Sequence, residues 1–177
     1  MINKILLLFL GVFITTGEVS DKTEKLANID SAEMLLGEFT QADLEKSPYS
    51  RWFTPGYANY KPNAEAVETI KKNIGDYEIL LFMGTWCGDS RYEVPKFFKL
   101  LDLVDFNREN LTSIAVNYSK KAPGDLDEKY NIHRVPTIIF IKDGKEVNRF
   151  VEYSVENLEE DIARIVDGKE YIDPYSE

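Results

Sequence analysis

The sequence predicts an α/β fold with a mixed central β-sheet. Two continuous apolar runs of strand length, Tyr77–Gly84 and Leu111–Tyr118, are separated by a helical pattern, and such runs suit strands buried on both faces. A strand, a helix and a second strand in succession imply a parallel pair. A third run, Pro136–Lys142, is followed by the turn signal Asp143-Gly144 and a fourth strand, which adds an antiparallel hairpin. We therefore expect a mixed sheet with helices on both faces.

The composition excludes several classes of protein. The chain has 177 residues, of which 44% are hydrophobic, which suits one packed domain rather than a disordered chain. Its formal net charge of −10 disfavours a nucleic-acid partner, because phosphate contacts need clustered Lys and Arg, and it disfavours charge-driven binding to anionic lipid. One cysteine and one histidine exclude an internal disulfide and a Cys- or His-rich metal centre, so we expect no metal.

Residues 1–17 have the pattern of a secretory signal peptide. Lys4 precedes the apolar run Ile5–Ile14, which is too short for a comfortable membrane span, and small residues follow up to Gly17. We therefore expect a periplasmic or secreted protein. The alternative is that this segment remains uncleaved and anchors the chain, which is the only membrane association that we expect.

Residues 18–62 are expected to form an N-terminal extension. Glu18–Asp30 is polar and has no periodicity, whereas Thr40–Lys46 opens with Thr-x-x-Asp, a capping pattern for a short helix. The segment Pro48–Pro62 is rich in aromatic residues, but its prolines and glycine interrupt any regular period, so we predict an ordered loop. We expect this loop to cover one edge of the sheet, and alternatively to wall a substrate groove.

The main domain is expected at residues 63–168. Apolar residues recur at helical spacing in Asn63–Ile74, with Asn63 as the N-cap. The helix that follows the first strand contains Pro95, which we expect to kink it. Four further elements are expected. They are a short helix at Asp125–Tyr130, the second hairpin strand at Glu146–Val151, the last helix at Glu156–Val166 and a C-terminal tail at residues 169–177.

Trp86-Cys87-Gly88, between the first strand and its helix, resembles the redox loop of the thioredoxin superfamily. Pro95 follows at the distance at which thioredoxins kink this helix. Lys129–Val147 reads KYNIHRVPTIIFIKDGKEV and is similar to the thioredoxin segment that holds a cis-proline. The resemblance covers Asn63–Val166 and implies a thioredoxin-like fold. The N-terminal extension resembles, more loosely, those of secreted bacterial thioredoxin-like proteins.

The resemblance implies that Cys87 is the catalytic nucleophile of thiol–disulfide exchange. It also implies a cis peptide bond before Pro136, beside the sulfur, where an extended substrate could pair with the backbone of Val135 by strand addition. The expected substrate-binding residues are Trp86, Gly88, Asp89, Val135, Pro136 and Thr137.

The expected place of Cys87 at a helix N-terminus suits a reactive thiol. Unpaired N–H groups and the helix dipole favour a thiolate there. Ser90 is the second expected catalytic residue, donating its hydroxyl to the sulfur; alternatively it only caps the helix. Asp89 works against the thiolate, because a nearby negative charge disfavours it.

Three residues depart from the thioredoxin pattern. Ser90 stands where thioredoxins carry a second cysteine, so the motif is Cys-x-x-Ser. Leu81 and Ala115 stand where they carry a buried acid and its partner lysine. A mixed disulfide on Cys87 must therefore be resolved by a thiol of the substrate, which gives isomerisation, or by glutathione or another small thiol, which gives reduction. We expect no cofactor, and we expect a monomer whose partners are protein thiols and disulfides or small thiols.

A second hypothesis is a binding module that kept the fold and lost turnover. It would hold cysteine-containing or unfolded clients on the same surface, and the three departures all favour it. An iron–sulfur cluster shared between subunits and a peroxidase are disfavoured, because the Cys-Gly-Phe-Ser and Pro-x-x-x-Thr-x-x-Cys patterns are absent. His133 has no second ligand nearby in the sequence, and we expect it at the surface or in packing.

Overall fold

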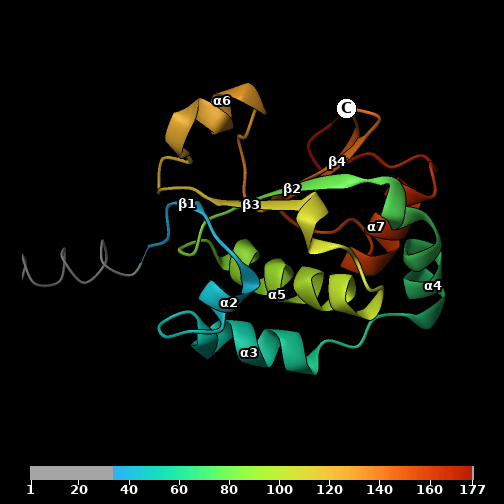
Figure 1. Cartoon of the computed structure of the whole chain (residues 1–177), viewed down its shortest axis with the longest axis horizontal. Coiled ribbons are helices and arrows are strands. Elements are labelled where there is room, and N and C mark those ends of the chain that lie inside the picture. Colours follow the sequence, from blue (N-terminus) through green and yellow to red (C-terminus); the bar gives the residue numbers. More distant parts are fainter. Residues whose placement is uncertain (1–33, 177) are drawn as a thin grey trace, which may run out of the picture. The chain divides into compact units, whose positions relative to one another are not determined.

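A computed structural model describes residues 34–176, so the expected signal peptide and the leader to Asp30 lie outside the described residues. At its centre is a five-stranded sheet with the strand order β1-β3-β2-β4-β5 (Figure 1). The strands are β1 (Gly37–Glu38), β2 (Glu78–Met83), β3 (Leu111–Ala115), β4 (Thr137–Lys142) and β5 (Lys145–Val151).

The sheet is mixed, as the sequence predicts. β2 and β3 are parallel, with Leu81 opposite Ser113, whereas β4 is antiparallel to both β2 and β5. β2, β3 and β5 therefore run in one direction. Their C-terminal ends meet the start of β4 at one edge of the sheet, where the segments that follow or precede them come together.

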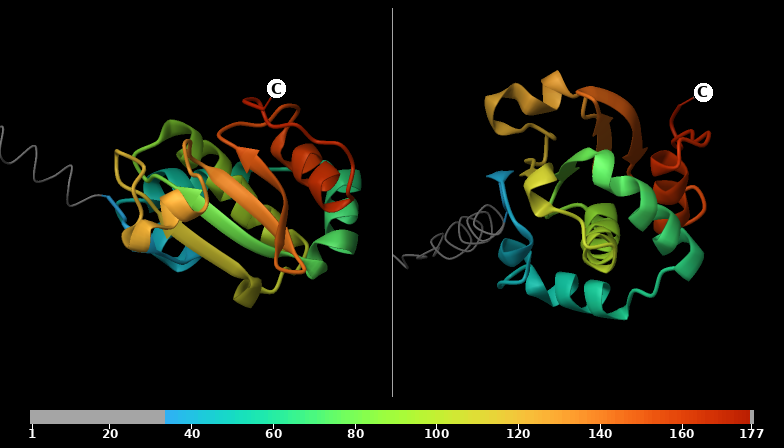
Figure 2. Two further views of the ribbon diagram at one scale, coloured as in Figure 1. Left: turned by 90° about the horizontal axis from the view of Figure 1, so that it is seen from above. Right: turned by 45° about the vertical axis from the view of Figure 1, so that its right-hand side comes forward.

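Helices lie on both faces of the sheet (Figures 1 and 2). They are α2 (Gln41–Leu44), α3 (Ser50–Asn59), α4 (Ala64–Asn73), α5 (Gly88–Leu103), α6 (Leu126–Lys129) and α7 (Leu158–Val166). α2 begins at the predicted capping box of Thr40 and Asp43, and Asn63 caps α4 by accepting from two backbone N–H groups. Pro95 lies inside α5.

The two faces of the sheet pack into two clusters. Ile79, Leu81 and Met83 of β2 join the cluster that holds the inner faces of α4, α5 and α7. Phe82, between them in the strand, joins the smaller cluster on the opposite face, beside α6. Alternate residues of a strand point to opposite faces, which is why this strand is apolar throughout.

The prediction of a loop over Pro48–Pro62 is wrong, because Ser50–Asn59 forms helix α3. Its Phe53 is 1% exposed and contacts the ring of Phe98 in α5 at a centroid distance of 5.9 Å. A Cβ on Gly56 would lie 3.0 Å from Pro95, so this glycine permits the close approach of α3 and α5. Tertiary packing here overrides the weak helix propensity of proline and glycine.

Two further features were not predicted. β1 adds a short antiparallel strand beside β3. The C-terminal segment 169–176 has no helix or strand, yet its Tyr171 is buried and packs into the larger cluster. Within residues 34–176, no helix has both the length and the apolar character that spanning a membrane requires.

Candidate functional site

Cys87 lies at the edge of the sheet where the strand ends converge. The backbone N–H of Cys87 donates to Gly84 O over 2.9 Å, which turns the chain sharply after β2. Its own carbonyl accepts the first helical hydrogen bond, from Arg91 N at 3.0 Å, so Cys87 is the N-cap of α5. The sulfur is thus placed at the start of a sixteen-residue helix.

The sulfur contacts a segment far away in the sequence. The thiol donates to the carbonyl oxygen of Val135 over 3.1 Å, and the nearest Asp89 carboxylate oxygen is 4.0 Å from the sulfur. The Val135–Pro136 peptide bond is cis. Cys87 is half-buried, so part of this residue is exposed to solvent.

The predicted substrate residues differ in exposure. Gly88 and Asp89 are exposed, and Trp86 is half-buried. Val135, Pro136 and Thr137 are buried, and the Thr137 hydroxyl donates to Arg134 O over 2.8 Å. A substrate bound beside residues 135–137 would therefore contact mainly their backbone atoms rather than their side chains.

Trp86 is held in place by its indole. Its Nε1–H donates to Val116 O over 3.0 Å, and its ring lies 5.3 Å from the ring of Tyr118, which is exposed. A Cβ on Gly84 would lie 2.6 Å from the indole carbon Cε2. Gly84 is therefore required for the observed position of Trp86.

Ser90 is fully buried and has a partner that the sequence did not indicate. Its Oγ accepts the N–H of Gly84 over 3.2 Å, which ties the end of β2 to the first turn of α5. Arg91 adds a similar link, because its Nε donates to Thr85 O over 2.6 Å. The predicted donation from the Ser90 hydroxyl to the sulfur stays a prediction.

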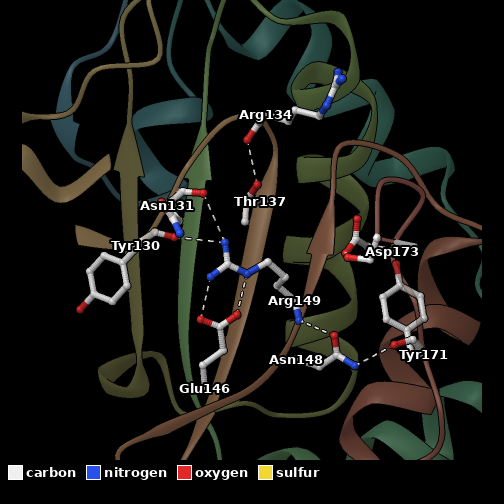
Figure 3. Close-up of polar contacts among 10 residues, drawn as sticks. Tyr130, Asn131, Arg134, Thr137, Glu146, Asn148, Arg149, Tyr171 and Asp173 are labelled. Carbon is white, nitrogen blue, oxygen red and sulfur yellow. Dashed lines mark hydrogen bonds and ion pairs between the residues drawn. The ribbon is translucent and has the colours of Figure 1, made fainter. Parts of the chain in front are cut away.

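Arg149 supports the segment before Pro136 from below (Figure 3). It forms a two-point ion pair with Glu146, with N–O distances of 2.5 and 2.7 Å. Its third nitrogen donates to the backbone carbonyl of Tyr130 over 3.1 Å and reaches that of Asn131 at 3.5 Å. No sequence pattern indicates this role, because Asn131 and Tyr130 lie eighteen and nineteen residues before Arg149 in the chain.

The interior beside the site lacks the proton-handling pair of the thioredoxin pattern. Leu81 and Ala115 are fully buried in the apolar cluster that also holds Val94 of α5. The buried carboxyl of α5 is instead Glu93, whose pKa is raised by burial, while the Lys96 ammonium at 3.1 Å opposes the rise. The carboxylate of Glu93 therefore forms an ion pair with the ammonium group of Lys96.

No metal site is evident in the described part of the chain. Residues 34–176 contain no group of three or more His, Cys, Asp or Glu side chains arranged to hold an ion. His133 is exposed. Arg134, the next residue, pairs with Glu152 at 3.0 Å.

Comparisons with known proteins agree with this geometry. The model of the Thioredoxin family matches residues 62–164. Thioredoxin H-type from Oryza sativa subsp. indica is 30% identical over 118 residues, which cover 60% of this chain and 82% of that protein. Thioredoxin H-type 1 from Nicotiana tabacum is 27% identical over 99 residues, which cover 55% and 74%.

Solved structures are similar over a comparable part of the chain. The thioredoxin of Fasciola hepatica is 31% identical and covers 57% of this chain and 91% of its own, with a TM-score of 0.39. A Pseudomonas aeruginosa protein of unknown function is 16% identical and covers 67% and 81%, with a TM-score of 0.49. The matched family region contains Cys87 and Pro136 but ends before the C-terminal segment.

Proposed function

Because the chain belongs to the thioredoxin family, we propose that it carries out thiol–disulfide exchange with Cys87 as the nucleophile. The observation that carries this proposal is the position of the sulfur. It is half-buried at the start of α5 and lies 3.1 Å from the carbonyl oxygen of Val135, in front of a cis-proline. A structural cysteine would instead be sealed in an apolar core.

The exchange needs the thiolate. Once the thiol has lost its proton to solvent, the sulfur attacks one sulfur of a substrate disulfide, forms a new S–S bond and expels the other sulfur as a thiolate. Cys87 is the N-cap of α5, and the dipole of a helix favours negative charge at its N-terminus. Substrate residues near the sulfur would contact Trp86 and the backbone of Val135.

The second half of the reaction needs a thiol from outside this chain. The sequence has one cysteine, so no internal thiol can attack the mixed disulfide. A thiolate of the substrate gives isomerisation, and glutathione or another small thiol gives reduction. In both cases the incoming thiolate forms a disulfide with the substrate sulfur, and Cys87 leaves as a thiolate.

A binding module without turnover is the second candidate function. It is favoured by Leu81 and Ala115, because no buried ionisable group at these positions can assist proton transfer. Such a protein would retain cysteine-containing or unfolded clients at the same surface. The two candidate functions make different predictions: an exchange enzyme needs the Cys87 sulfur to capture a client, whereas a binding module does not.

The apolar run Ile5–Ile14 supports the further proposal that the protein works in the periplasm or outside the cell. Disulfide-containing protein substrates are common in such oxidising compartments.

The test is capture of a covalent intermediate. We expect incubation with 5,5′-dithiobis(2-nitrobenzoate) to release one equivalent of thionitrobenzoate per chain, since the chain has one cysteine. Adding glutathione should then release the second half and restore the thiol. The variant Cys87→Ser should release none, and Ser90→Ala serves as a control that keeps the sulfur.

An absence of adduct in the folded protein would contradict the exchange proposal. If Cys87→Ser still captures unfolded clients as well as the native chain does, the binding module is the better description.

A further inference from the structure

The C-terminal segment 169–176 contacts Arg134 and Glu152, which flank Pro136, although it lies beyond the region that the family model matches. Its first fixed point is Tyr171, which is 8% exposed. The carbonyl oxygen of Tyr171 accepts Nδ2 of Asn148 in β5 over 3.0 Å (Figure 3). The segment is therefore anchored on the strand whose next residue, Arg149, supports the loop before Pro136.

The second fixed point is Tyr175, near the end of the segment. Its ring lies over the guanidinium group of Arg134, 3.7 Å from the carbon Cζ, and its hydroxyl donates to the carboxylate of Glu152. Arg134 and Glu152 also pair with each other at 3.0 Å. Tyr175 thus contacts both members of an ion pair.

That ion pair lies on either side of Pro136. Arg134 directly precedes Val135, whose carbonyl accepts the Cys87 thiol. On the other side, the N–H of Glu152 donates to Pro136 O over 2.7 Å. The contacts of Tyr175 therefore end one residue from the backbone that faces the sulfur.

Tyr175 does not close the site. Cys87 remains half-buried rather than sealed while the segment is docked. The rings of Tyr153 and Tyr175 meet edge to face at 5.9 Å and are 46% and 41% exposed, so they form a partly exposed aromatic ledge. Solvent can reach this ledge, and part of Cys87 is also exposed to solvent.

The ledge and Trp86 lie on different sides of Cys87. The indole of Trp86, which donates to Val116 O, and the ring of Tyr118 lie beyond the end of β3, whereas Tyr153 follows β5, and β2 and β4 lie between these strands. Three strand spacings amount to about 14 Å, which is the length of roughly four residues of extended chain. An extended polypeptide whose cysteine meets Cys87 can contact both aromatic groups at once, and a small disulfide cannot.

We propose that Tyr175 is a specificity-determining residue of the Cys87 site, which favours polypeptide disulfides with an apolar side chain near the reacting cysteine over small disulfides. This inference rests on the proposed exchange function and names the class of its substrate. Arg134 and Glu152 act as positioning residues, because they hold the Tyr175 ring beside Pro136.

The test compares two reagents that share one leaving group. One is the mixed disulfide of methanethiol and thionitrobenzoate, and the other is the mixed disulfide of thionitrobenzoate with a five-residue peptide that carries Phe beside its cysteine. In each, Cys87 forms a disulfide with the methyl or peptide sulfur and releases coloured thionitrobenzoate. The measured quantity is the ratio of the two second-order rate constants.

We expect Tyr175→Ala to lower the rate with the peptide about three- to tenfold, the loss expected for one aromatic contact. The rate with the methyl reagent should stay unchanged. Tyr175→Phe keeps the ring over Arg134 and should lose less than the alanine variant. Ile172→Ala is the matched control, because Ile172 is 53% exposed in the same segment.

An unchanged ratio in Tyr175→Ala, or a faster reaction with the peptide, would overturn this inference and leave the exchange function standing. If neither reagent modifies Cys87 in the native protein, the exchange function fails and this inference fails with it.

Discussion

The sulfur of Cys87 lies 3.1 Å from the carbonyl oxygen of Val135, a residue 48 positions later in the chain. The first residue follows β2 and the second precedes β4, two strands that pair directly and run in opposite directions. The pairing brings the end of one strand and the start of the other to the same edge. The site is therefore a property of the folded sheet, and unfolding separates its two halves.

Replacing Ser90 by Cys should convert the chain to dithiol chemistry. The positions are three residues apart at the start of a helix, where Cβ atoms lie about 5–6 Å apart, close enough for a disulfide after a small adjustment. We expect adducts on Cys87 to be resolved internally, so the fraction trapped on non-reducing gels should fall. Ser90→Ala, which also loses the contact with Gly84 N, is the control; equal trapping in both variants would contradict the prediction.

Replacing Gly84 by Ala should displace Trp86. The new methyl group would lie 2.6 Å from the indole, so the ring must move away from Val116 O. We expect a loss of about 1–3 kcal/mol in the free energy of unfolding, which is typical of overpacking. Chemical denaturation measures the loss, and Trp86 fluorescence in a Trp52→Phe background reports the displacement.

The matched control for Gly84 is Gly88→Ala. A Cβ on Gly88 meets no atom within 4 Å, so stability should be unchanged or slightly higher. Equal losses in the two variants would show that the Trp86 contact is not the cause.

Replacing Arg149 should loosen the segment before Pro136. Arg149→Ala removes the contact with the carbonyl of Tyr130 as well as the ion pair with Glu146, and we expect a loss of about 1–2 kcal/mol in the free energy of unfolding. Arg149→Lys should recover little, since an ammonium group cannot make both sets of contacts. Reaction of Cys87 with a peptide disulfide should slow in both variants.

Glu146→Gln separates the two contributions of Arg149. It weakens the ion pair but leaves the carbonyl contacts, so the exchange rate should stay near that of the native protein. A slowing as large as that of Arg149→Ala would assign the effect to the ion pair instead.

Glu93 should make stability depend on pH. Burial raises the pKa of its carboxyl above the ordinary value of 4.5, so the folded chain binds this proton more tightly than the unfolded chain. The stability that Glu93 contributes is therefore fully present below pH 4.5 and declines as the pH rises through the folded pKa.

Glu93→Gln removes this titration. The unfolding free energy of the native chain minus that of the variant should fall as the pH rises from about 4 to 7, and urea denaturation at intervals of pH measures it. The difference removes the part of the Asp161 titration that is independent of Glu93; the pKa of Asp161 is also raised by burial, and its charge further raises that of Glu93. A difference that grows with pH would contradict the prediction.

The sequence indicates the core of the fold because the core has regular periodicity. The apolar run at β2 and the Asp143-Gly144 turn can each be predicted from residues that are adjacent in the sequence, and both elements form as expected. α3 was missed because Pro55 and Gly56 suggest a break locally, while the reason for the helix is a contact with Pro95 far along the chain.

The site could be predicted only in part, for the same reason. Cys87 and Pro136 stand in recognisable local patterns. Arg149, Glu152 and Tyr175 act through partners that are brought close only by the folded sheet, and one of them lies in a segment without periodicity. Their roles follow from distances between strands rather than from residue order.

The apolar residues Leu81 and Ala115 bear on how long a mixed disulfide on Cys87 would last, rather than on how tightly a substrate binds. If Cys87 forms mixed disulfides as proposed, the apolar side chains on its inner side supply no group that could assist their cleavage, and each disulfide would persist until a thiol arrives from solvent. Its lifetime would then be inversely proportional to the surrounding thiol concentration. A captured substrate chain would therefore stay bound longest in compartments with the lowest concentration of free thiol.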